Sequence, residues 1–185
     1  MIKTRVILSA ALAFAVTATA SQAAVTVIGG GMAQACSKAA LSGATEFKFE
    51  AVCTMALDSE LLSMRDRAGT YVNRGVLKLR RKEFASAEFD FNKAIQAKPD
   101  LGEAYTNRGA SSVGARRYAE GLTDLNKALE LGVDEPEKAY YNRALAYEGL
   151  DNMKAAYFDY QKAIELKPDW EQPKKELARF SVGRR

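Results

Sequence analysis

Apolar and small residues recur at helical spacing through the middle of the chain. Between residues 71 and 79 they lie three or four positions apart, and the same spacing returns between residues 84 and 95. Arg81 and Lys82 separate the two stretches, and Pro99 ends the second, because proline has no N–H to continue a helix. The pattern predicts two helices joined by a short turn, which is a helical hairpin.

The hairpin pattern occurs three times at a nearly constant period. Matching pentapeptides begin at Tyr71, Tyr105 and Tyr140, so the steps are 34 and 35 residues. Small residues stand where the two helices of each hairpin would cross, as at Gly75 and Ala87. Self-similarity with a fixed period of about 20 to 50 residues is the signature of stacked repeats. We therefore predict an all-α fold, an α-solenoid of antiparallel helical hairpins with units at 68–101, 102–136 and 137–170.

The three units resemble tetratricopeptide repeats of a bacterial envelope protein. The aromatic residue, the Gly or Ala four positions later and the closing Pro of units one and three stand where that family has them. The tripeptide Asn73-Arg74-Gly75 is typical of an Asn-Arg-Gly variety of the repeat. Unit two departs from the pattern with Val133 in place of the final proline and with Gly121 where Ala is usual. The resemblance implies a solenoid whose concave face binds peptides.

Segments on both sides of the repeats complete the predicted solenoid. Residues 32–67 show two further helical patterns and predict a divergent N-terminal hairpin that caps the stack. Residues 24–31 include three consecutive glycines and are expected to be a flexible leader. Residues 171–185 are expected to form a C-terminal capping helix followed by a basic tail that ends in Arg184 and Arg185.

Residues 1–23 have the layout of an export signal. Lys3 and Arg5 precede an apolar run of eleven residues, from Val6 to Val16, and small residues follow. The run is shorter than the roughly 20 residues that span a bilayer, so no stable membrane anchor is expected. Cleavage is expected after Ala23 or, alternatively, after Ala20. We expect export, most naturally to a bacterial periplasm; the alternative is a buried N-terminal helix of a cytosolic protein.

Two cysteines are placed for a structural disulfide. Cys36 and Cys53 lie at nearly equal distances from the predicted turn near Ala44, so an antiparallel helix pair sets them opposite each other. An oxidising compartment favours the bridge, which the chain-entropy model values at about 3 kcal/mol. Two free core thiols and a redox-active pair are the alternatives.

Each repeat carries an Arg and an Asp sixteen residues apart. A partly buried guanidinium favours a carboxylate that accepts two hydrogen bonds, so we predict structural ion pairs between the two helices of each hairpin. The alternative is that these arginines serve a ligand. The predicted pairs are Arg74 with Asp90, Arg108 with Asp124, and Arg143 with Asp159.

The first helix of each unit is expected to line a concave groove. The asparagines that follow the three tyrosines would form a ladder, and a carboxamide offers both the donor and the acceptor that a peptide backbone needs. In long arrays that this chain resembles, Asn at this position contacts an extended peptide; the alternative is that it braces the neighbouring hairpin. Scattered cations argue against a clamp for terminal carboxylates, and the apolar positions suit aliphatic side chains. The predicted groove residues are Val72, Asn73, Val76, Leu79, Thr106, Asn107, Val113, Tyr141, Asn142 and Leu145.

Composition narrows the class of function. The chain has 185 residues, no histidine and two cysteines, so the commonest general base and zinc ligand is missing. The net charge is +4, and loss of Lys3 and Arg5 with the signal leaves +2, which gives little attraction for nucleic acid. We expect an exported protein-interaction module that binds a peptide or helix of an envelope partner, with no enzymatic activity, cofactor or metal. A structural protein acting through self-association is the alternative, and an enzyme is a distant third.

Export makes a direct prediction about the mature N-terminus. N-terminal sequencing of the purified protein should find a start between Ser21 and Val25, with Ala24 as the preferred first residue. A cytosolic protein that still begins at Met1 would contradict it.

Overall fold

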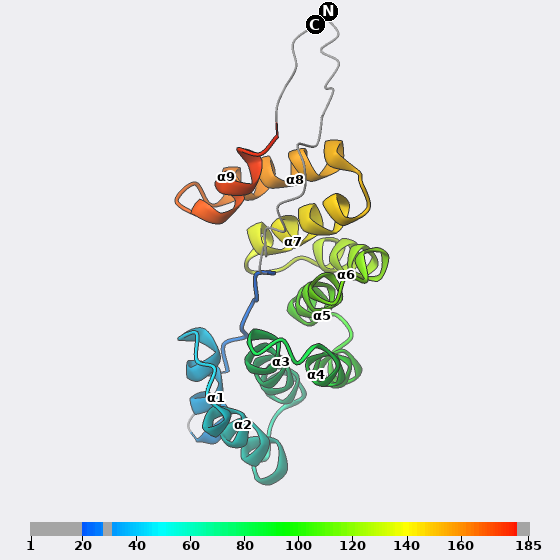
Figure 1. Ribbon diagram of the computed structural model, residues 1–185. Helices are drawn as coiled ribbons and strands as arrows, with labels where there is room; N and C mark the ends of the chain where they lie inside the picture. The colour runs from blue at the N-terminus through cyan, green and yellow to red at the C-terminus, as the bar shows by residue number, and fades with distance from the viewer. Residues whose placement is uncertain (1–19, 28–30, 181–185) are drawn as a thin grey trace, which may run out of the picture.

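A computed structural model describes residues 20–27 and 31–180 of the chain. These residues contain nine α-helices and no β-strand, so the predicted all-α solenoid is confirmed (Figure 1). Residues 1–19, 28–30 and 181–185 lie outside the described part, and with them most of the expected signal, two of the three glycines and the arginines of the tail. The helices are α1 (Met32–Leu41), α2 (Phe47–Ser59), α3 (Met64–Arg80), α4 (Phe84–Ala97), α5 (Gly102–Gly114), α6 (Tyr118–Leu131), α7 (Pro136–Gly149), α8 (Met153–Leu166) and α9 (Glu171–Leu177).

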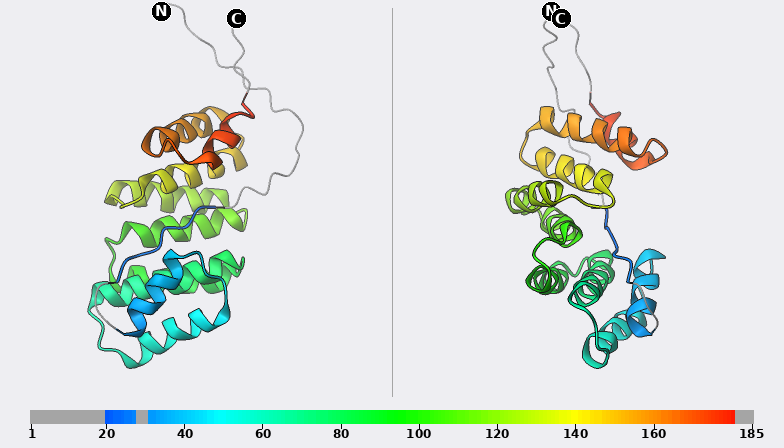
Figure 2. Two further views of the ribbon diagram at one scale, coloured as in Figure 1. Left: turned by 90° about the vertical axis from the view of Figure 1, so that its left-hand side faces the viewer. Right: turned by 180° about the vertical axis from the view of Figure 1, so that it is seen from behind.

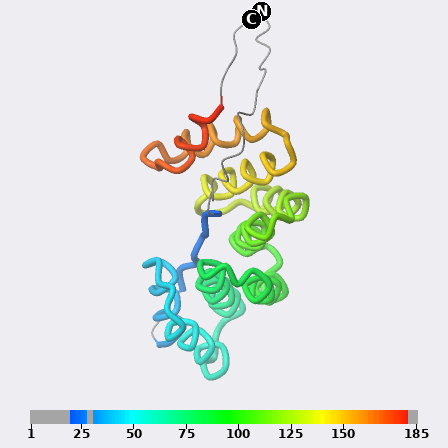
Figure 3. The backbone as a smooth tube through the Cα atoms, viewed as in Figure 1, coloured from blue at the N-terminus to red at the C-terminus, as the bar shows by residue number. Residues whose placement is uncertain are grey.

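Consecutive helices pair into hairpins, and the hairpins stack in chain order (Figure 3). The pairs α3 with α4, α5 with α6, and α7 with α8 are the most extensive contacts, and α4 and α6 join each hairpin to the next. The first helices also touch one another, α3 with α5 and α5 with α7. They therefore form one continuous face of the stack. None of the described helices has the length and apolarity needed to cross a membrane.

The same turn ends the first helix of every hairpin. Lys82, Arg116 and Asp151 adopt left-handed backbone conformations, with φ of 62°, 62° and 58°. The residue after each of them donates its backbone N–H to the carbonyl oxygen five residues earlier in the chain. Glu83, for example, donates to Lys78 at 3.1 Å. This is the Schellman ending of a helix, in which a left-handed residue reverses the chain.

Small residues let the two helices of each hairpin approach closely. A Cβ built on Gly109 would lie 2.7 Å from Cγ of Leu125 and 3.1 Å from the carbonyl oxygen of Gly121. Gly75 faces the ring of Phe91 in the same way. In the third hairpin Ala144 takes this position and is completely buried. The crossings of the first two hairpins thus favour glycine, and the crossing of the third accepts alanine.

All three predicted Arg–Asp pairs are present and share one geometry. In each, the guanidinium donates from Nε and Nη2 to the two carboxylate oxygens, at distances between 2.6 and 3.0 Å. The pKa of Arg108 and that of Arg143 are raised above the ordinary value. The main cause is the hydrogen bond to Asp124 in the first case and to Asp159 in the second. Each pair joins the first helix of a hairpin to the second.

The same arginines also reach the preceding hairpin. Nη1 of Arg74 donates to Thr54 of α2 at 3.0 Å, and Nη1 of Arg108 donates to Asn92 of α4 at 2.6 Å. Nη1 of Arg143 repeats the contact with Asn126 of α6 at 2.8 Å. Each guanidinium therefore connects three helices and fixes the spacing between successive units.

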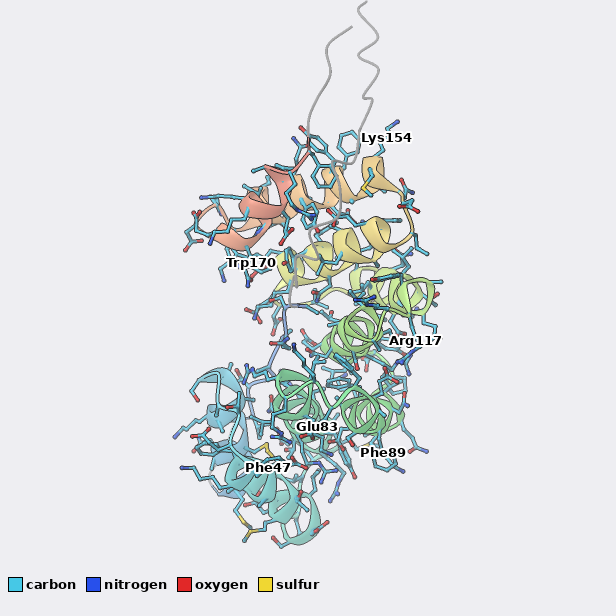
Figure 4. All side chains as sticks on the ribbon, viewed as in Figure 1. Phe47, Glu83, Phe89, Arg117, Lys154 and Trp170 are labelled. Carbon is cyan, nitrogen blue, oxygen red and sulfur yellow. A yellow bond between two sulfur atoms is a disulfide. The ribbon has the colours of Figure 1, made fainter. Side chains whose placement is uncertain are left out.

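The two ends of the stack are closed differently. At the N-terminal end, Cys36 of α1 and Cys53 of α2 form the predicted disulfide, and both are fully buried beside Leu77 of α3. At the C-terminal end, the Trp170 ring that precedes α9 lies 4.9 Å from the ring of Tyr141, and Figure 4 shows it beside α7.

Arg179 ties the C-terminal end to α7. Its Nη2 donates to both carboxylate oxygens of Glu148 at 2.8 Å and contacts Oε2 of Glu176 at 2.6 Å. Burial raises the pKa of Glu148, and the hydrogen bonds from Arg179 oppose that rise. We assign this cluster to docking of α9 on α7.

The ion pairs predict unequal losses of stability. Asp90 is fully buried and also accepts from Lys78 Nζ at 2.8 Å, so Asp90→Ala leaves Arg74 without its carboxylate and Lys78 with Glu50 alone, at 3.7 Å, and should cost up to ~5 kcal/mol. Asp124→Ala should cost ~3 kcal/mol, because Arg108 is more exposed than Arg74. Thermal melts measure both, with Asp100→Ala in an exposed pair as the control. Equal, negligible shifts in all three variants would show that the pairs do not stabilise the fold.

Candidate functional site

Three asparagines occupy the same place on the first helices of the three repeats. Asn73 lies on α3, Asn107 on α5 and Asn142 on α7. Since each sits two residues after the repeat tyrosine, equivalent helices present it toward the same face of the solenoid. We call these residues the Asn ladder. All three side chains are completely buried.

The chain covers the Asn ladder with its own N-terminal segment. Residues 20–27, which we call the strap, run in an extended conformation across α7, α5 and α3 toward α1 (Figure 1). The left view of Figure 2 shows this segment, in blue, crossing the first helices of the repeats. The strap crosses the repeats in the reverse of their order in the chain. Its first residues lie on α7, in the last repeat, and its later residues lie on α3, in the first.

Each asparagine pairs with both backbone groups of one strap residue. The N–H of Ser21 donates to Oδ1 of Asn142 at 2.8 Å, and Nδ2 of Asn142 donates to the carbonyl of Ser21 at 2.7 Å. Asn107 makes the same pair with Ala23 at 3.0 and 2.7 Å. Asn73 makes it with Val25 at 2.9 and 2.8 Å.

The two-residue step follows from the geometry of an extended chain. The N–H and C=O of one residue point to the same side, and the next residue points its groups to the opposite side. The Asn ladder therefore contacts every second residue, at 21, 23 and 25. Nδ2 of Asn107 also donates to the carbonyl of Glu103 in its own helix at 2.8 Å, which fixes the orientation of that carboxamide.

The strap side chains are buried to different degrees. Ala23 and Val27 are buried, with exposed fractions of 2% and 5%, whereas Thr26 is exposed. A Cβ built on Gly69 of α3 would lie 2.9 Å from Cγ1 of Val25 and 3.3 Å from Cγ2 of Val27. The absence of a side chain at Gly69 thus makes room for two valines of the strap.

The N-terminal hairpin holds one end of the strap. Oγ of Ser37 on α1 donates to the carbonyl of Val25 at 2.9 Å and accepts from the N–H of Val27 at 3.3 Å. Val27 packs with Ala33 of α1 and Ala56 of α2. The divergent hairpin is therefore a clamp on the strap as well as a cap on the stack.

The other predicted groove residues lie in the core or under the strap. Val72, Val76 and Leu79 form a buried cluster against which the strap residues Ala20, Ala24 and Val25 pack. Val113, Tyr141 and Leu145 belong to a second buried cluster. Thr106 is buried, and its Oγ1 donates to the carbonyl of Gly102 within α5.

Tyr141 differs most from its predicted place. Its ring packs between Tyr160 at 5.7 Å and Trp170 at 4.9 Å, and burial raises the pKa of its hydroxyl. Tyr141 therefore belongs to the contact with the C-terminal cap, which the repeat pattern alone does not reveal.

The leader also differs from the sequence-based expectation. Residues 24–31 were expected to form a flexible leader, yet 24–27 lie in the strap with the backbone of Val25 paired to Asn73 and Ser37. Sequence reasoning missed Ser37 and the role of residues 20–27. The available signal was the run of small and β-branched residues from Ala23 to Val27, which is compatible with an extended chain.

The site is suited to backbone recognition. Among residues 20–27 and 31–180, no group of three or more His, Cys, Asp or Glu side chains is arranged to hold a metal ion. The strongest arrangement of polar groups is the row of carboxamides, which offers hydrogen bonds and no nucleophile or base.

Comparison with known proteins identifies the repeats. Residues 68–101 and 137–169 each match the tetratricopeptide repeat family. A search of curated proteins found no match. The helix pair α5–α6 repeats the turn, the Arg–Asp pair and the asparagine of the two matched units.

Solved structures share the fold. The TPR domain of Arabidopsis OM64 is 23% identical, with a TM-score of 0.59 over 63% of this chain and 96% of that domain. MamA from Desulfovibrio magneticus RS-1 is 18% identical, with a TM-score of 0.62 over 80% of this chain and 82% of that one. The first TPR of Spaghetti (RPAP3), bound to the HSP90 peptide SRMEEVD, is 24% identical, with a TM-score of 0.57 over 62% and 90%. The chain thus contains two tetratricopeptide repeats within an all-α helical solenoid.

Proposed function

We propose that this chain is a protein-interaction module whose concave face binds an extended peptide segment of another protein. The observation that carries the proposal is the strap, which already lies in the groove with six hydrogen bonds to the Asn ladder. An extended partner segment offers the same backbone groups at the same two-residue step. The strap therefore stands in for such a partner.

The contacts favour a binding role for the asparagines over bracing between hairpins. Six of the side-chain hydrogen bonds of the Asn ladder go to the strap, and one goes to the helix that carries the asparagine, from Asn107 to Glu103. The connection between hairpins is made by the neighbouring arginines instead. The arginines therefore connect successive hairpins, and the asparagines offer a hydrogen-bond donor and acceptor to a peptide backbone.

Recognition through the backbone determines how strongly and how selectively the groove binds a peptide. Each hydrogen bond contributes about 0.5–1.5 kcal/mol net, so one asparagine contributes roughly 1–3 kcal/mol to a bound segment. The backbone is the same in every sequence, so selectivity depends on which side chains fit at alternate positions. A similarly folded domain, the first TPR of Spaghetti (RPAP3), is bound to a peptide, which is consistent with this use of the solenoid.

We further propose that the module works in an exported compartment, the bacterial periplasm, on an envelope partner. The basic start, the apolar run and the small residues up to Ala23 support export. The buried disulfide between Cys36 and Cys53 supports an oxidising compartment, where such bonds persist.

Removal of a single asparagine tests the proposal. A protein that begins at Ala24 should bind an acetylated and amidated peptide of residues 20–23, and NMR signals of the Asn side-chain amides should shift on binding. Asn107→Ala and Asn142→Ala should each weaken binding roughly 5- to 150-fold, because each removes two hydrogen bonds to the peptide.

Gln96→Ala is the matched control, since it removes an exposed carboxamide from α4. Its affinity should equal that of the parent protein. Melting temperatures of all variants separate lost binding from lost folding. Unchanged affinity in both Asn variants, together with lowered melting temperatures, would show that the asparagines brace the solenoid instead.

A further inference from the structure

We propose that cleavage of the leader after Ala23 opens the groove, and that Asn107 and Asn142 then bind an extended segment of another protein with a small side chain at the position of Ala23. This rests on the proposed function and on export. It adds a regulatory step to that function and a description of the partner.

The expected cleavage site and the groove use the same residues. Ser21 and Ala23 stand three and one residues before the expected cut, where an export protease requires small side chains. In the folded chain the same two residues pair with Asn142 and Asn107. Cleavage after Ala23 therefore removes both partners of these asparagines in one step.

The cut leaves the other half of the strap in place. Val25 keeps its pair with Asn73 and its hydrogen bond from Ser37. Val27 keeps its packing against Ala33 and its place beside Gly69. The groove is thus vacated over α5 and α7 and stays filled over α3, so a partner segment lies across α7 and α5 and ends next to Ala24.

Cleavage frees two carboxamides for a new backbone, and that of Asn107 stays oriented by its own helix. Oδ1 and Nδ2 of Asn142 and of Asn107 together lose four hydrogen bonds when residues 21 and 23 leave. The hydrogen bond from Asn107 to Glu103 does not involve the strap and continues to orient the side chain. An extended peptide that restores the four bonds meets a preorganised site.

The Ala23 position defines the partner's side chains. Ala23 is 2% exposed, and both its N–H and its C=O are hydrogen-bonded to Asn107. A longer side chain therefore has no free space at this position. The preceding residue, Gln22, is partly exposed. The matching partner segment is extended and has a small residue at the position of Ala23.

An uncleaved strap competes with such a partner. It is tethered to the groove, and a short tether gives an effective concentration on the order of millimolar. A free peptide must exceed that concentration to displace residues 21 and 23. Binding is therefore suppressed until the segment is removed.

Two forms of the protein test the proposal, one that begins at Ser21 and one that begins at Ala24. They correspond to the two expected cleavage sites and keep every described helix. The probe is the acetylated and amidated peptide of residues 20–23, which covers only the vacated part of the groove, titrated by NMR after both forms are shown to melt at similar temperatures. The form that begins at Ala24 should bind at least tenfold more tightly.

Peptide variants test the partner motif. Leu in place of the peptide's Ala at position 23 should weaken binding at least tenfold, and Leu in place of Gln at position 22 should leave it unchanged. Equal binding of the peptide by the two protein forms would overturn the switch, as would a purified protein that begins at Ser21. Either result leaves the peptide groove itself intact. Absence of binding to the form that begins at Ala24 would overturn both proposals.

Discussion

The pairing of one asparagine carboxamide with both backbone groups of an extended residue is the interaction on which the site depends. It occurs three times with nearly the same distances, at Asn142, Asn107 and Asn73. Successive contacts fall on every second strap residue, a step of about 6.8 Å in an extended chain. The stacking of the first helices must match that step, so the spacing between repeats sets what the groove can hold.

Three consecutive residues on each first helix serve three different neighbours. In unit two, Asn107 faces the strap, Arg108 faces α6 and the preceding α4, and Gly109 lies at the crossing with α6. Successive residues on a helix point about 100° apart, so one tripeptide can serve the groove, the stack and the hairpin together. The ion pairs fix the position of each first helix and thereby align the carboxamides along the groove.

The repeats could be predicted from the sequence because their signals are local and periodic. Helical spacing, the turn near Lys82 and the sixteen-residue separation of Arg74 from Asp90 all lie within one hairpin. The place of the strap could not be predicted in this way. Its contacts join residues 48, 84 and 121 positions apart, and nothing in residues 20–27 resembles the repeats. Tyr141 was misplaced because the groove was predicted from the first helices alone, and Trp170, the last residue of unit three, covers its ring.

Amide hydrogen exchange of the strap is the most direct test of the central claim. The N–H groups of Ser21, Ala23 and Val25 are bonded to the Asn ladder, and within the described residues no acceptor is found for those of Gln22, Ala24 and Thr26. In protein that retains residues 20–27, the account predicts slow exchange at the odd positions and fast exchange at the even ones. Asn107→Ala should abolish the protection of Ala23. Uniformly fast exchange across residues 21–26 would contradict the account, because it would show that the groove does not hold an extended backbone.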